Sequence, residues 1–437
     1  MIGSLHGTLP VSFVDYLIVI DLEIRYRRGI MEYMPPKTRP ASRTLTDTHR
    51  TCSILGIKRW RARMAALNDM IARGARTGAL IAQRHAAELA AEKCRQGLKL
   101  TPSEAMWAQR VGTLFPLYKS LSEAGRVRFE ARLDAALSGT ETLVPLLHLA
   151  RTASLHTALG FEVRLSGLED GTPFDLLITR EGCEAEIVCD TLSAEEGRTV
   201  HRAAWMRLMD RIDPDLQSWL ATHPGRYLLK MTLPQGLRSA DGAGGETDAL
   251  AALHQRISSM LTQSRRADHD EAAVLRLDPL MLAAAQASEN GLMGQLRREF
   301  GPEAHLAVTG SGPAVFVLAA RAASENEVAI AMRRRLAALA PARLSGTRPG
   351  ILAMFIEDTD RVEWQILRDH LTLEGEARQF LTFPEARPVV AVTCASRLEL
   401  GVELTSTGPE RAAMRFRNPS HPAAKWPALA SAVLSTV

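Results

Sequence analysis

The chain has 437 residues, of which 46% are hydrophobic and 5% aromatic. This length allows two or three globular domains, and the composition excludes collagen-like, coiled-coil and wholly disordered classes. The net charge of +4 conceals an asymmetry, because residues 1–137 carry a net +10 and the remainder a net −6. Five scattered cysteines without C-x-x-C spacing disfavour a disulfide framework or a zinc site, and they predict a reducing, cytoplasmic location.

The N-terminal segment, residues 1–57, shows no sustained hydrophobic period and contains a basic, proline-rich stretch. We expect it to be irregular or disordered. Its most apolar run, from Val11 to Ile24, includes Asp15, Asp21 and Glu23. That run is too short and too charged for a membrane span, and it lacks the basic start and cleavage site of a signal peptide. The sequence therefore predicts no membrane association.

Residues 58–137 predict a small helical segment. Apolar residues such as Met64, Leu67 and Ile71 recur at helical spacing. Thr101 and Glu104 match the two ends of a capping box at the start of a further helix.

The same helical segment is basic. Arg59 and Arg63, among several arginines and lysines, are placed to follow a nucleic-acid phosphate backbone. No helix-turn-helix pattern stands out, so the sequence gives no basis for assigning sequence-specific readout. The alternative is that these arginines are simply solvated.

The stretch from Gly171 to Ser193 carries the strongest chemical signal. It reads as two strands joined by a short turn, and three acids share one face of the second strand: Glu184, Glu186 and Asp190. Asp175 on the neighbouring strand could add a fourth carboxylate. A divalent cation would relieve the repulsion between them, because hard cations prefer oxygen ligands.

Pro173-Phe174-Asp175, followed by Glu184-Ala185-Glu186 on the next strand, resembles the PD-(D/E)XK nuclease superfamily over about residues 138–268. The predicted flanking elements have the superfamily's α-β-β-β-α-β order. They are a helix at 142–159, strands at 161–165, 174–179 and 183–190, a helix at 195–218 and a strand at 226–233. The resemblance implies an α/β, restriction endonuclease-like core that hydrolyses or binds nucleic-acid phosphodiesters. It also implies Mg²⁺ or Mn²⁺ held by Asp175, Glu184 and Glu186.

The lysine of the motif is missing. Its position is Glu186 if Glu184 is the acid, and Val188 if Glu186 is the acid. Some members resemble this chain in having glutamate there, which would give Glu186 a catalytic role, and others supply the lysine from a neighbouring element. Lys230 on the predicted strand 226–233 is our candidate for a displaced catalytic lysine, and the alternative is an ordinary edge cation. A degenerate, inactive copy also fits.

Two further features bear on the site. Some members of the superfamily place an acid on the first helix near the metal, a position that Glu141 could fill, although a carboxylate also favours a helix N-terminus for its dipole alone. Arg198 and Arg202 fall on one side of the predicted helix 195–218, where they could contact phosphates.

Residues 269–437 predict an α/β extension, with strands at 305–308, 314–319, 350–356 and 389–393, that either extends the nuclease sheet or forms its own layer. Three functions remain open: a metal-dependent nuclease, a catalytically degenerate nuclease fold used as a binding or scaffold module, and a structural protein with chance acids. The choice between DNA and RNA and the oligomeric state also remain open.

Overall fold

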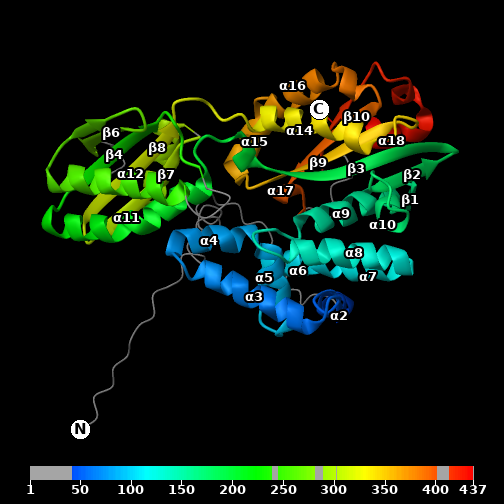
Figure 1. Ribbon diagram of the computed structural model, residues 1–437, viewed down its shortest axis with the longest axis horizontal. Coiled ribbons are helices and arrows are strands. Elements are labelled where there is room, and N and C mark those ends of the chain that lie inside the picture. Colours follow the sequence, from blue (N-terminus) through cyan, green and yellow to red (C-terminus); the bar gives the residue numbers. More distant parts are fainter. Residues whose placement is uncertain (1–41, 239–244, 281–288, 302, 401–412, 437) are drawn as a thin grey trace, which may run out of the picture.

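The computed structural model describes residues 42–238, 245–280, 289–301, 303–400 and 413–436. It is a mixed α/β structure with two separate sheets and an N-terminal helical arm (Figure 1). The first sheet has the strand order β1-β2-β3-β9-β10-β11, and the second has the order β5-β6-β4-β8-β7. The coarse prediction of an α/β protein with a helical N-terminal part is therefore confirmed.

The helical arm packs around Trp60, Leu67, Phe129 and Leu133, all of which are buried. Thr101 accepts from Glu104 N, and the Glu104 side chain accepts from Thr101 N, so the predicted capping box is confirmed. The helices of the arm are α2 (Ser42–Thr51), α3 (Ile57–Ile71), α4 (Ala75–Arg84), α5 (Ala86–Arg95), α6 (Pro102–Gly112), α7 (Leu114–Ser120) and α8 (Glu123–Ala136). Helix α2 corrects part of the prediction that residues 1–57 are irregular, while residues 1–41 lie outside the described residues.

The first sheet is a meander continued by parallel strands. β1, β2 and β3 are antiparallel neighbours, β9 and β10 run parallel to β3, and β11 is antiparallel to β10. Helix α9 covers one face, and α14 and α16 cover the other (Figure 1). The strands are β1 (Glu162–Arg164), β2 (Leu176–Arg180), β3 (Cys183–Ser193), β9 (Gly350–Glu357), β10 (Val389–Ser396) and β11 (Met414–Arg417). The helices of this unit are α9 (Val144–Ala158), α10 (Ser166–Glu169), α14 (Val328–Arg343), α15 (Arg361–Asp369), α16 (Thr372–Phe380), α17 (Arg397–Leu400) and α18 (Ala430–Val433).

The second sheet carries α11 and α12 on one face, where Trp205, Leu208, Ile257 and Phe316 are buried together. Its strands β7 and β8 form a hairpin whose turn is Gly312-Pro313. The strands are β4 (Arg226–Leu233), β5 (Ala267–His269), β6 (Val274–Pro279), β7 (His305–Ser311) and β8 (Ala314–Ala322), and the helices are α11 (Arg202–Thr222), α12 (Gly245–Thr262) and α13 (Glu289–Phe300).

The second unit interrupts the first. The chain leaves after β3 through a short 3-10 turn (Ala194–Gly197) and returns at the start of α14. The two ends touch, because Glu327 N donates to Gly197 O at 2.6 Å. The strand parallel to β3 is therefore β9, and the prediction that 226–233 is the fourth strand of the same sheet is wrong. β4 pairs with β6 and β8 in the second sheet.

The C-terminal part is consequently divided between the two sheets. β7 and β8 belong to the second sheet, whereas β9, β10 and β11 extend the first. The predicted helix 195–218 also changes. Residues 194–197 form the 3-10 turn, which Ser193 caps, and α11 begins only at Arg202 and runs through Pro214 to Thr222.

Candidate functional site

Asp175 lies just before β2 and is 3% exposed. Its Oδ1 accepts from Arg132 Nη1 of α8 at 3.0 Å. Its Oδ2 accepts from Arg343 Nη2 of α14 and from the backbone amide of Cys189, both at 2.8 Å. Both carboxylate oxygens are therefore occupied by donors from three different elements, two of them charged.

Glu186 is fully buried on β3 and has a different set of partners. Its Oε2 accepts from Ser345 N at 2.9 Å, and its Oε1 accepts from the Ser345 hydroxyl at 2.5 Å. Arg348 bridges the two glutamates, with Nη1 3.5 Å from Glu186 Oε1 and Nε 2.6 Å from Glu184 Oε2. The loop that follows α14 therefore holds this pair. Ser345 and Arg348 carried no recognisable signal in the sequence.

The structure does not bring the three carboxylates together. Glu186 shares a strand face with Val188, which packs on the α14 side of the sheet. Asp175 instead lines a cavity with Cys189 and with Leu146 of α9, on the other side. Within the described residues, no group of three or more His, Cys, Asp or Glu side chains is arranged to hold a metal ion. The expected convergence of Asp175, Glu184 and Glu186 is corrected accordingly, and these residues do not fit Mg²⁺ or Mn²⁺ as a shared ion.

The residues of β3 that lie beside Asp175 are apolar or thiol. Asp175 N donates to Ile187 O at 2.9 Å, and Cys189 N donates to the Asp175 carboxylate. Burial, together with the charge of Asp175, raises the pKa of the Cys189 thiol far above its ordinary value. The strand therefore offers neither a carboxylate nor a lysine next to Asp175.

The cavity beside Asp175 has a volume of about 360 Å³. Glu141 and Thr142 at the entry to α9 line it, together with Arg132 and Arg343. Glu141 thus lies on the same side of the sheet as Asp175. The sequence predicted Glu141 and Asp175 as candidates but missed the two arginines, which come from a helix of the arm and from the end of α14.

Lys230 lies on β4, outside the sheet that contains Asp175. Its Nζ is 3.7 Å from Asp278 Oδ2 and 5.8 Å from the centre of the Phe300 ring. The prediction of a displaced catalytic lysine is therefore wrong, because the strand that carries it belongs to the second sheet.

The two candidate phosphate contacts of the arm have internal partners. Arg63 is 2% exposed and donates to the carbonyls of Gly139 and Glu141. Arg59 pairs with Asp134 at 2.5 Å and donates to Ser138. Arg63 therefore connects α3 to the loop before α9, which corrects its predicted role as a phosphate contact. One third of the Arg59 side-chain surface remains exposed to solvent.

Arg198 and Arg202 join the two units instead of facing a ligand. Arg198 is buried and pairs with Glu195 and Glu363, and it also donates to Asp358 O. Burial alone would lower the pKa of Arg198, but the charges of Glu363 and Glu195 raise it above its ordinary value. Arg202 pairs with Asp360 and Glu363 at 3.2 and 3.3 Å. Arg198 is not available to phosphates, which corrects that prediction.

A buried carboxyl lies at the end of β9. Glu357 is 5% exposed, and its oxygens lie 3.3 and 3.4 Å from the Thr142 hydroxyl at the entry to α9. Burial and the neighbouring Asp358 raise the pKa of Glu357 to about 7, against the opposing effect of Arg84 and Arg397.

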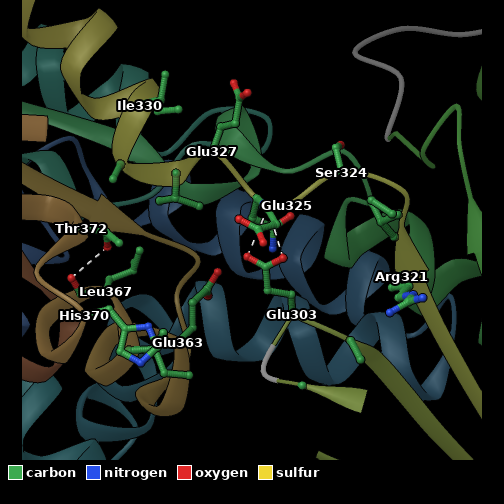
Figure 2. A pocket seen from close by; sticks show the side chains of 18 of the residues that line it. Glu303, Arg321, Ser324, Glu325, Glu327, Ile330, Glu363, Leu367, His370 and Thr372 are labelled. Carbon is green, nitrogen blue, oxygen red and sulfur yellow. Dashed lines mark hydrogen bonds between the residues drawn. The ribbon is translucent and has the colours of Figure 1, made fainter. Parts of the chain in front are cut away.

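A larger cavity, of about 920 Å³, lies between the second unit and helices α14–α16. Figure 2 shows Glu303 pointing toward Glu325, with Glu363 and His370 on the opposite wall. Both oxygens of Glu303 accept from Asn326 N at 3.2 Å. Burial raises the pKa of Glu303, and the charges of Glu325 and Glu363 act in the same direction. The wall of the cavity that carries Glu303 and Glu325 is therefore acidic.

Comparisons of the chain with protein-family models, curated proteins and solved structures found no match. In the described part of the chain, no helix combines the length and the apolar character needed to cross a membrane.

Proposed function

We propose that this chain is a nuclease-like protein that binds nucleic acid without hydrolysing it. The element order supports the nuclease-like part. If the second unit and the four-residue helix α10 between β1 and β2 are left out, the chain runs α9, β1, β2, β3, α14 and β9, with β3 parallel to β9. This is the α-β-β-β-α-β order that the sequence resemblance implies, with about residues 198–326 inserted before the second helix.

The observation that carries the proposal is the neutralisation of Asp175. Two guanidinium groups and one amide occupy its oxygens, so a metal ion would have to displace charged donors from a buried carboxylate. A buried carboxylate that has lost its paired arginines would leave uncompensated charge in the structure, which typically costs several kcal/mol. Arginine therefore provides the counter-charge that a metal supplies in an active member.

The neighbours of Asp175 support the same proposal. Metal-assisted hydrolysis needs further oxygen ligands and a group that assists the nucleophile. Ile187 and Cys189 occupy the adjacent places on β3, while Glu184 and Glu186 are engaged with Arg348 and Ser345. The residues around Asp175 are therefore consistent with a chain that keeps the nuclease-like fold but lacks metal-assisted hydrolysis.

Calorimetric titration with Mn²⁺, run beside a cleavage assay on mixed DNA and RNA, tests the proposal. We expect wild type and Asp175→Asn to behave alike, with no saturable Mn²⁺ binding that depends on Asp175 and no metal-dependent cleavage. Cleavage by the wild type that Asp175→Asn abolishes would refute the proposal and restore the active nuclease.

A further inference from the structure

One face of the second sheet is left free by α11 and α12, and α13 covers part of it, with Leu296 buried against Leu228 and Val317. Leu229, Met231 and Leu233 of β4 pack under α11 and α12. Because side chains alternate along a strand, Arg226, Leu228, Lys230 and Thr232 point to the other side. We call this side the outer face. The apolar residues of this side are buried under α13, and the cations lie around them.

The strand register gathers cations on the outer face. In the strand register, Lys230 lies opposite Arg276 on β6, and Thr232 lies opposite Arg321 on β8. Lys230 and Arg276 keep 45% and 71% of their side-chain surface exposed, and Arg226 and Arg321 are exposed as well. Four cations from three neighbouring strands therefore lie on one side of the sheet.

This arrangement has an electrostatic cost. Like charges directly opposite each other across two strands destabilise the pair. Both cations form ion pairs with the same carboxylate, that of Asp278, which lies 3.7 Å from Lys230 Nζ and 3.0 Å from Arg276 Nε. An anionic partner on this face would relieve the remaining repulsion.

Exposed and half-buried apolar groups accompany the cations. The Phe300 ring lies 5.8 Å from Lys230 Nζ, and Val274, beside Thr232 in the register, is 45% exposed. Surfaces that hold single strands combine cations along the backbone with aromatic or apolar groups for the bases.

We propose that the outer face binds a single strand of nucleic acid through Arg226, Lys230, Arg276 and Arg321. The class of ligand rests on the proposed function, whereas the location rests on the register and exposure of these cations. Arg321 and Glu303 both line the acidic cavity, which therefore adjoins this end of the outer face (Figure 2). Its carboxylates repel phosphates, so the bound strand ends or turns away at Arg321.

The test is fluorescence anisotropy of the full chain with labelled single-stranded DNA and RNA of about 20 nucleotides, which is longer than a typical single-fold site. Salt is varied between about 50 and about 200 mM. We expect Lys230→Glu/Arg276→Glu to weaken binding at least about tenfold at low salt. The slope of log K against log salt should fall by about 1.4, because each phosphate contact contributes about 0.7 for single strands. The neutral variant Lys230→Gln/Arg276→Gln should fall between this variant and the wild type, and circular dichroism checks that each variant is folded.

The matched control is Arg211→Glu, an exposed cation on α11, the helix that covers the opposite face. It should change the affinity by less than about twofold, as expected for a distant, screened charge. Equal losses in the control and the double variant would overturn the proposal, as would no loss in either. Binding of polyglutamate but not of oligonucleotides would reject nucleic acid as the occupant. Cleavage of the oligonucleotide by the wild type would refute the proposed function but not the binding site on the outer face. Tight binding that survives the double variant would refute the site on the outer face but not the proposed function.

Discussion

Arg343 Nη2 lies 2.8 Å from Asp175 Oδ2, although the two residues are 168 positions apart in the chain. Arg343 also donates to Pro173 O at 2.8 Å, so one side chain fixes both the strand entry and the carboxylate. The end of α14 is thereby attached to the β2–β3 hairpin. Arg132 completes the enclosure from α8.

The enclosure of Asp175 predicts non-additive stability. Arg132→Ala and Arg343→Ala should each destabilise the protein by about 1–2 kcal/mol, since one guanidinium remains. The double variant should lose more than the sum of the two single losses, about 3–5 kcal/mol, because the buried carboxylate then lacks a counter-charge. Adding Asp175→Asn should recover part of that loss. Urea unfolding of the full chain measures these values, and Arg334→Ala on the exposed side of α14 is the control. Simple additivity would contradict the idea that the arginines neutralise one charge.

Because Glu186 is buried, we expect its replacement by lysine to destabilise the protein. Glu186→Lys should destabilise the protein by more than about 3 kcal/mol, because it would bury a cation beside Arg348 and leave Ser345 without its acceptor. Glu184→Lys, at a position where 40% of the side chain is exposed, should cost under about 1 kcal/mol. Thermal melts of the two variants measure the difference. Equal losses would show that burial of Glu186 is not what sets the cost.

The raised pKa of Glu357 predicts a pH dependence. A carboxyl whose folded pKa of about 7 exceeds its ordinary value of 4.5 stabilises the fold at low pH. That contribution is complete below about 4.5 and is lost as the pH rises through about 7. Glu357→Gln should therefore flatten stability between these values and raise it at pH 8, by at most about 3 kcal/mol. Urea midpoints of both proteins across this pH range measure the effect, and parallel curves would contradict it.

The arm joins the second unit through a helix N-terminus. Asp210 on α11 accepts from Arg76 N and Thr77 N of α4 at 2.9 and 2.8 Å, as a capping residue would. Asp210→Ala should cost about 1 kcal/mol and increase amide exchange in α4 more than in α6. The exposed Asp134→Ala, on α8, is the control for a lost carboxylate elsewhere in the arm. Unchanged exchange in α4 would show that packing alone holds the junction.

Local patterns predicted the hairpin well. β2 and β3 occupy the predicted stretch, and α9 and β1 precede them within two residues of the expected bounds. The side of the sheet on which Asp175 lies was not predictable. The alternation rule assumes a regular ladder, but Asp175 N donates to Ile187 O, although Leu176 is already paired with Ile187. This departure brings Asp175 to the side of Cys189.

The strand that completes the first sheet was also beyond local reasoning. Strand 226–233 and strand 350–357 are both apolar and both follow a helix, so sequence order favoured the nearer one. What decides the pairing is the contact of Gly197 with the start of α14, where a β-carbon on Gly197 would collide with the backbone of Val328. Arg63, Arg198 and Arg343 illustrate the same limit, because a basic residue reads as solvated until its distant partner is known.

The meeting of Gly197 and Glu327 has a consequence for the order of folding. Arg348 and Glu184, which flank the pairing of β3 with β9, are 164 residues apart in the chain, and closing so long a loop costs conformational entropy. Once the second unit has folded, its ends are already adjacent, and the loop to be closed shrinks to the short segments that flank them. The second unit should therefore fold first and hold the ends of β3 and α14 close together. The parallel half of the first sheet should assemble afterwards.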